Sequence, residues 1–140
     1  MHTISRYHDF SYGHRVHGHE NKCAHLHGHN GRIIFVCSTT GLDSIGRVVD
    51  FSVVKALLCE WLEKNWDHKF LLWYMDPWSE TLQKIDQDGV VLLPFNPTAE
   101  NMAAYLVDTI GPFLLGESGV KLVSCTVEET RKCSATYHAI

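Results

Sequence analysis

The sequence predicts an α+β domain in which a four-stranded antiparallel sheet carries two helices on one face. Runs rich in β-branched and aromatic residues lie near both ends of the chain, and two stretches with apolar residues at helical spacing lie between them. Strand and helix do not alternate regularly, which argues against a doubly wound parallel sheet. With 140 residues and a hydrophobic fraction of 45%, the chain suits one domain over residues 1–140. The predicted element order is ββααββ.

The first two strands are expected over residues 4–16 and 29–39, with a polar loop between them. Side chains alternate between the two faces of a strand, so His27 and His29 can project to one side. A third ligand from the neighbouring strand can then meet them, and His14 is well placed to be that ligand.

The first helix is expected over residues 52–65, where Ser52 is a plausible N-cap and apolar residues form a stripe at helical spacing. The second helix begins in the segment NPTAEN, in which Asn96 or Thr98 can act as the N-cap. We expect this helix to reach Ile110, because the Gly-Pro pair that follows favours a helix end.

Two further strands are expected over residues 120–129 and 134–139. The edges of such a sheet are unpaired, and unpaired edges favour pairing with further copies of the chain. We therefore expect a homo-oligomer in which sites can lie between subunits.

Composition argues against several classes of partner. The formal net charge of −4 and the pI near 6.2 provide no basic field for nucleic acid. No run approaches the roughly 18 apolar residues of a membrane span, and the N-terminal ten residues contain no apolar signal segment. The cysteines are odd in number and scattered, which fits reduced thiols better than a disulfide framework. We expect a soluble, cytoplasmic protein with no nucleic-acid or membrane partner.

The clustering of histidine is the most informative feature, because six of the ten histidines fall within residues 14–29. Imidazole is the commonest nitrogen ligand of zinc, and three protein ligands with one open position are typical of a catalytic zinc site. His14, His27 and His29 are the predicted ligands of Zn2+. Histidines that bind no metal remain an alternative, and His17, His19 or His25 can replace a member of the trio.

Three further groups are candidates for chemistry. Cys23 lies in the polar loop beside the metal motif, where a nearby cation or histidine can activate its thiol. Buried, inert thiols are the expected state of Cys37, Cys59 and Cys125, which lie in apolar segments. Asp67 can orient the imidazole of His68, although a solvated pair is the default interpretation of such neighbours.

Glu129 lies near the end of a predicted strand, on the face that carries Cys125 and Val127. A carboxylate there is either exposed at the strand end or buried with a partner. Its two oxygens match the two ring-side N–H donors of a pterin or guanine edge.

The segments FSYGH, CAHLHGHN, VVDF, WDHKFLL, NPTAEN and VEET, in this order, resemble the 6-pyruvoyl-tetrahydropterin synthase family over nearly the whole chain. The resemblance implies the tunnelling fold (T-fold), with four strands and two helices per subunit. It also implies an oligomeric barrel, assembled as a homohexamer of two trimeric rings with sites at subunit interfaces.

The resemblance also implies roles for individual residues. His14, His27 and His29 look like the zinc ligands, and Cys23 looks like the catalytic thiol. Asp67 and His68 look like its partners in proton transfer. Substrate-binding roles fall to Glu129, as the pterin anchor, and to Thr98, which can also be a helix cap.

Three residues separate Cys23 from the HGH motif, and this spacing resembles the 6-carboxytetrahydropterin synthases of queuosine biosynthesis. That branch implies a lyase that converts 7,8-dihydroneopterin triphosphate to 6-carboxytetrahydropterin, with release of acetaldehyde and triphosphate. A 6-pyruvoyl-tetrahydropterin synthase, a dihydropterin side-chain aldolase and a non-catalytic zinc-binding protein remain alternatives. The candidate triphosphate ligands, left unranked, are Lys22, Lys69, Arg131 and Lys132.

The sequence departs from the family pattern beside the proposed metal ligands. FSYGH lacks the usual pair of small residues before the first zinc histidine, and HGHNG lacks the aromatic residue that commonly follows HGHN. WDHKFLLW lacks the usual asparagine after the leucine. These changes affect the lining of the pocket, so they bear on substrate preference more than on metal binding.

Overall fold

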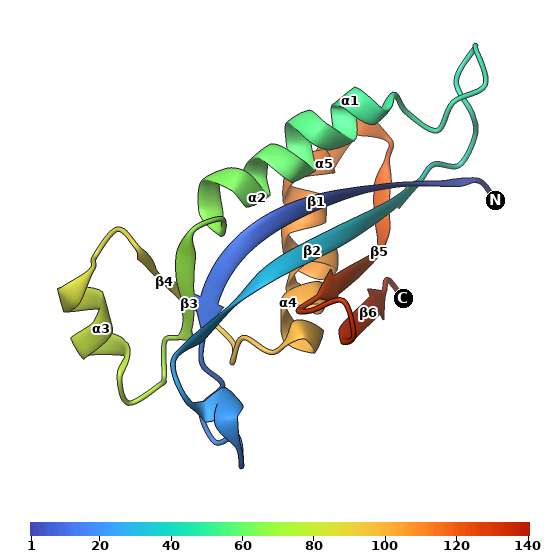
Figure 1. Cartoon of the computed structure of the whole chain (residues 1–140). Helices are drawn as coiled ribbons and strands as arrows, with labels where there is room; N and C mark the ends of the chain where they lie inside the picture. Colours follow the sequence, from blue (N-terminus) through green and yellow to red (C-terminus); the bar gives the residue numbers. More distant parts are fainter.

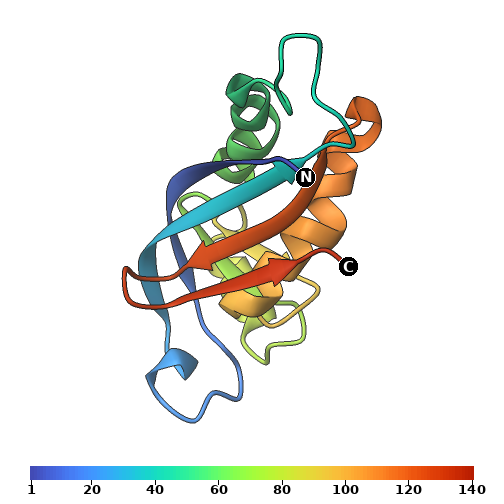
Figure 2. The same ribbon diagram turned by 90° about the vertical axis from the view of Figure 1, so that its right-hand side faces the viewer.

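The computed structural model, which describes all 140 residues, contains one curved six-stranded sheet with its two long helices on the same side (Figures 1 and 2). The strand order is β4-β3-β1-β2-β5-β6. None of the helices has the length and apolar character that crossing a membrane would require. The α+β class and the placement of the helices follow the sequence prediction.

Four antiparallel strands form the predicted part of the sheet. β1 (Thr3–His14) pairs with β2 (His27–Ser38), β2 pairs with β5 (Lys121–Glu128), and β5 pairs with β6 (Ser134–His138). Along β1, buried and more exposed side chains alternate toward the C-terminal end, as expected of a strand with one covered face.

Two strands that the sequence reading did not predict extend this sheet beyond β1. β3 (Lys69–Trp73) runs parallel to β1, β4 (Val90–Leu93) runs parallel to β3, and α3 (Ser79–Ile85) connects them. The strand count of four was therefore too low, and the sheet is mixed. Apolar runs of four or five residues carry too little periodicity to be assigned from sequence alone.

The first long helix runs without interruption through α1 (Phe51–Val54), the π-helical η2 (Lys55–Cys59) and α2 (Glu60–Asn65). Ser52 is not its N-cap, contrary to the prediction. The Asp50 side chain accepts a hydrogen bond from the Ser52 backbone N–H at 2.9 Å, so Asp50 caps the helix and Ser52 lies in its first turn.

The second long helix comprises α4 (Ala99–Tyr105), the π-helical η3 (Leu106–Ile110) and α5 (Gly111–Leu115). Of the two predicted candidates, Asn96 and Thr98, the N-cap is Thr98, because its hydroxyl accepts from the Asn101 backbone N–H at 3.1 Å. The predicted end at Ile110 is wrong. Pro112 has no backbone N–H, which a residue in the first turn of a helix does not need. The π-helical turn η3 ends at Ile110, so Pro112 lies in the first turn of α5 and the helix continues past it.

The core lies between the sheet and these two helices. Trp66 at the end of the first helix stacks on Tyr105 of α4, with ring centroids 6.4 Å apart. The buried thiols behave as predicted, and burial raises the pKa of Cys37 to about 11. The largest fully buried side chains include those of Trp66, Phe35, Ile33, Leu58, Leu62, Leu71, Met102 and Leu106.

Candidate metal and substrate site

The register of the β1–β2 hairpin brings three histidines together at its loop end. His14 lies directly opposite His27, and His29 lies two residues further along β2 on the same face. The ligand nitrogens of the three residues all lie within 4.8 Å of one another, and the Nε2 atoms of His14 and His29 are 3.1 Å apart. The predicted trio therefore converges on one point.

Backbone carbonyls set the orientation of two of these rings. The Nδ1 of His14 lies 2.8 Å from the Pro97 carbonyl oxygen, and the Nδ1 of His27 lies 2.7 Å from the His25 carbonyl oxygen. A carbonyl can only accept, so each Nδ1 donates its proton, and each Nε2 is an unprotonated nitrogen that can accept. The Nε2 of His27 is buried and has no hydrogen-bond partner. A metal ion is the group that such an arrangement fits.

Electrostatics favours the neutral, metal-binding form of these rings. Burial lowers the pKa of His14 to about 4, and the hydrogen bond to Pro97 opposes this shift only in part. Burial also lowers the pKa of His29, against the effect of the nearby Glu129 carboxylate. A cation therefore does not have to displace protons from these two rings at neutral pH.

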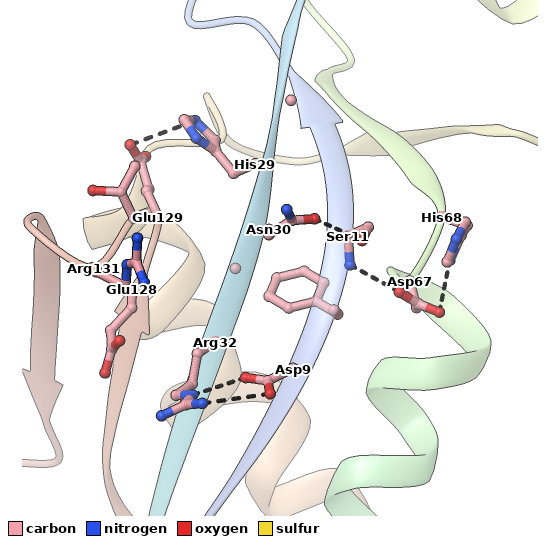
Figure 3. A pocket seen from close by; sticks show the side chains of 14 residues that line it. Asp9, Ser11, His29, Asn30, Arg32, Asp67, His68, Glu128, Glu129 and Arg131 are labelled. Carbon is pink, nitrogen blue, oxygen red and sulfur yellow. Dashed lines mark hydrogen bonds and ion pairs between the residues drawn. The ribbon is translucent and has the colours of Figure 1, made fainter.

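Glu129 lies just beyond β5 and reaches toward the trio. Its Oε2 is 3.7 Å from the Nε2 of His29, and its side chain is 23% exposed, so the carboxylate is accessible to a ligand beside the histidines. Figure 3 shows His29 and Glu129 facing each other between β2 and β5. They line one margin of a groove of about 960 Å³ that crosses the sheet.

Asp67 and His68 line the opposite margin of this groove, beyond β1 (Figure 3). Asp67 accepts from the Ser11 backbone N–H at 2.9 Å, and its second oxygen lies 2.8 Å from the Nδ1 of His68. Burial opposes ionisation of Asp67, but hydrogen bonds with Ser11, His68 and Glu63, together with the charge of His68, lower the pKa of the carboxyl. The His68 ring is 80% exposed, and its backbone adopts the left-handed region at φ 61°. The predicted pair is therefore formed, although no hydrogen bond joins it to the histidine trio.

Cys23 lies in the short 3-10 turn η1 (Lys22–Ala24), beyond the paired ends of β1 and β2. It is half-buried, and its thiol makes no hydrogen bond to the trio. The other histidines of the cluster do not join the trio either. The Nδ1 of His17 accepts from Arg15 at 3.2 Å, and the Nδ1 of His19 accepts from the Asn21 backbone N–H at 2.9 Å.

A sequence model of the family described as 6-pyruvoyl tetrahydropterin synthase matches residues 3–139. The chain belongs to this family. The 6-carboxy-5,6,7,8-tetrahydropterin synthase of Rickettsia bellii is 37% identical over 128 residues, covering 89% of this chain and 91% of that protein. A probable 6-carboxy-5,6,7,8-tetrahydropterin synthase of Halobacterium salinarum is 39% identical over 126 residues, covering 89% and 79%.

Solved structures of other proteins share the fold. An uncharacterized protein from Wolinella succinogenes matches with a TM-score of 0.83 at 24% identity, covering 99% of this chain and 98% of that one. The 6-pyruvoyl tetrahydropterin synthase of Caenorhabditis elegans matches with a TM-score of 0.70 at 24% identity, covering 99% and 95%. The predicted tunnelling fold is thus confirmed, with two strands more than expected.

Tyr12 and Gly31, which lie in two of the segments that depart from the expected family pattern, pack against each other. A Cβ atom added at Gly31 would lie 2.8 Å from the Tyr12 ring and 3.0 Å from the Phe10 ring, closer than van der Waals contact allows. Tyr12 stacks on Phe10 with centroids 4.7 Å apart, and both rings are buried. The aromatic ring of Tyr12 on β1 therefore occupies space that would be needed by a side chain at position 31 on β2.

No sequence pattern predicts the groups that orient the candidate metal ligands. Pro97 and His25 act through their backbone carbonyls, and a carbonyl has no sequence signature. The NPTAEN segment predicts a helix cap, and its Asn96 also exchanges hydrogen bonds with the His17 backbone, at 2.9 and 3.3 Å. The only sequence signal for a role of Asn96 is its place in the NPTAEN motif.

Proposed function

We propose that the protein is a zinc-dependent 6-carboxytetrahydropterin synthase, a lyase that acts on 7,8-dihydroneopterin triphosphate. The convergence of three imidazoles on one point beside the accessible carboxylate of Glu129 carries this proposal. The curated relatives named 6-carboxy-5,6,7,8-tetrahydropterin synthase support the choice of branch. The products are 6-carboxytetrahydropterin, acetaldehyde and triphosphate, and the pathway is queuosine biosynthesis.

When bound by His14, His27 and His29, zinc supplies Lewis-acid chemistry that makes protons on the substrate side chain easier to remove. Glu129 accepts the two N–H donors of the pterin edge and so fixes the ring next to the trio. Thr98, beyond capping α4, lies one residue from the carbonyl that orients His14 and contributes to substrate binding from there. Cys23 and the Asp67–His68 pair exchange protons with the substrate side chain from different sides.

Association of several chains can bring the proposed catalytic groups together. Asp67 and His68 make no hydrogen bond to the histidine trio of their own chain, and β4 and β6 leave both edges of the sheet without a partner strand. We propose a homohexamer of two trimeric rings in which neighbouring chains complete each site. Of the basic residues considered for the triphosphate, Arg131 lines the groove, whereas the Lys69 ammonium donates to the Asp88 carbonyl at 2.9 Å.

A product assay tests the proposal. The purified protein is incubated with 7,8-dihydroneopterin triphosphate before and after removal of metal by a chelator, and the products are identified by mass. We expect 6-carboxytetrahydropterin and acetaldehyde, with turnover lost on chelation and regained on addition of Zn2+. A pyruvoyl product or cleavage to a shorter side chain would instead assign one of the other activities of this scaffold.

Zinc content separates these enzymes from a non-catalytic zinc-binding protein. The contacts of His17 and His19 described above favour one ion per chain over several. More than one zinc ion per chain, together with no turnover, would contradict the proposed function.

A further inference from the structure

We propose that Arg15 and Asp76 are positioning residues that hold the turn carrying Cys23 in its working place. The inference rests on the catalytic role proposed for Cys23, which it deepens. It assigns a function to the connection between β3 and α3, a segment without a predicted role.

Arg15 directly follows the metal ligand His14, and it forms a buried bidentate ion pair with Asp76. Its Nε lies 2.6 Å from one carboxylate oxygen of Asp76, and its Nη2 lies 3.0 Å from the other. The two side chains are only 7% and 0% exposed. A bidentate pair of this kind fixes the plane and the position of the guanidinium.

The remaining donors of the guanidinium bind the loop between β1 and β2. Nη1 donates to the carbonyl oxygen of Ala24 at 3.1 Å, and Ala24 is the residue that follows Cys23. Nη2 also contacts the Nδ1 of His17 at 3.2 Å. The ring of Trp78 covers the guanidinium at 3.5 Å, and the Trp78 backbone N–H donates to Asp76 at 2.8 Å. Arg15 thus connects the turn carrying Cys23 to the Asp76–Trp78 segment.

The turn itself has few other anchors. It contains no buried residue and its N-cap makes no side-chain hydrogen bond, while Cys23 is tied to the strand end by one backbone bond from Val16 at 2.8 Å. Burying an ion pair is a costly way to stabilise a fold. A bidentate pair that also holds the carbonyl next to a proposed catalytic thiol is instead suited to setting the position of that thiol.

The test compares Asp76→Asn, which keeps the shape of the side chain but removes its charge, with Glu80→Gln as the matched control. Glu80 lies on the nearby α3 and pairs only with Lys84, at 3.0 Å, on the surface. Each full-length protein is treated with iodoacetamide, and alkylation of Cys23 and of the exposed Cys133 is followed by peptide mass spectrometry. Cys133 serves as the internal standard, and the buried cysteines report any global unfolding.

In Asp76→Asn we expect the ratio of Cys23 to Cys133 alkylation to rise severalfold, because the released turn exposes its thiol. We expect kcat to fall by up to about 100-fold with little change in KM, since the substrate site itself is intact. Zinc content should stay the same. Glu80→Gln should match the wild type in all of these measurements.

A folded Asp76→Asn protein with an unchanged alkylation ratio would overturn the inference, even if its Tm were lower, because the pair would then be merely structural. If Asp76→Asn does not fold, Arg15→Lys takes its place, since lysine keeps the charge but cannot make the bidentate contact. The alkylation measurement needs no turnover. Failure of the proposed function and failure of this inference are therefore distinguishable.

Discussion

The paired ends of β1 and β2 and the loop that joins them hold their functional residues in different ways. Strand register places His14 opposite His27, and the pleat places His29 on the same face. The position of Cys23 in the loop instead depends on contacts with remote parts of the chain, through Arg15 to Asp76 and through His17 to Asn96. Hydrogen bonds along two whole strands support the proposed metal ligands, whereas a few side chains and one backbone bond from Val16 support the turn of Cys23.

The difference predicts that the proposed metal binding and the proposed turnover can be separated by mutation. Changes in the loop or in its remote supports should alter turnover and leave the metal in place. Changes in the hairpin should remove the metal. The following experiments test this division, beginning with the largest expected effect.

Replacement of His27 by alanine should abolish stoichiometric zinc binding. Loss of an outer partner of a metal ligand lowers metal affinity by about 10–100-fold, and loss of a ligand should exceed this. Zinc content after dialysis, measured by atomic absorption, checks the prediction. His19→Ala is the control and should retain one ion per chain. Full zinc content in His27→Ala would show that the ligands are not those of the hairpin.

Replacement of Cys23 by alanine should remove turnover while zinc and the oligomeric state persist. Loss of a positioned acid–base group lowers rates by about 100–10,000-fold. Steady-state kinetics, zinc content and the mass of the assembly in solution check this prediction. Cys133→Ala should keep normal kinetics. Loss of zinc from Cys23→Ala would make Cys23 a metal ligand and break the division between the hairpin and the loop.

Acid should weaken the support of the loop. Burial opposes ionisation of Asp76, but hydrogen bonds from Arg15 and from the Trp78 backbone outweigh it, so the pKa of this carboxyl is lowered in the folded protein. Its contribution to the free energy of unfolding is present above the unfolded pKa of about 3.9 and is lost as the pH falls through the lower folded value. Asp76→Asn should therefore be less stable than Glu80→Gln at pH 7, by about 3 kcal/mol. Denaturant unfolding should show this gap closing below about pH 4. A gap that is constant with pH would contradict the role of the ion pair.

Replacement of Glu129 by glutamine should weaken substrate binding and spare the metal. The amide nitrogen would face a pterin N–H donor, which should cost about 1–3 kcal/mol of binding free energy. Calorimetric titration with a dihydropterin measures the loss. Glu128→Gln, on the neighbouring residue, is the matched control. Unchanged affinity in Glu129→Gln would remove this residue from the anchoring role.

The smallest expected effect is a gain of stability within the hairpin. The hydroxyl of Tyr12 is buried and has no hydrogen-bond partner. Tyr12→Phe removes this unsatisfied group and keeps the ring that packs over Gly31, so the free energy of unfolding should rise by about 1 kcal/mol. Denaturant unfolding checks the sign. A loss of stability would show that the hydroxyl has a partner in the assembled protein.

Much of this protein could be predicted from its residues taken in order. The four antiparallel strands and the two helices follow from residue spacing within single elements, and the clustered histidines and the helix cap follow from short local motifs. Three predictions were wrong. Ser52 is not a cap because the Asp50 side chain caps the helix, and the second helix does not end at Ile110 because a π-helical turn continues it. β3 and β4 were not predicted because each is defined by its pairing with an adjacent strand.

By itself, the sequence determined the fold class, the identity of the candidate metal ligands and the buried state of three thiols, because strand alternation and helical spacing are local properties. Only the tertiary structure decided which carbonyls orient the imidazoles, how Tyr12 and Gly31 share one space, and that Arg15 joins Asp76 to the turn of Cys23. These contacts join residues up to 83 positions apart, as His14 and Pro97 are. Such pairs are selected by the packing of the whole chain, and no local pattern records them.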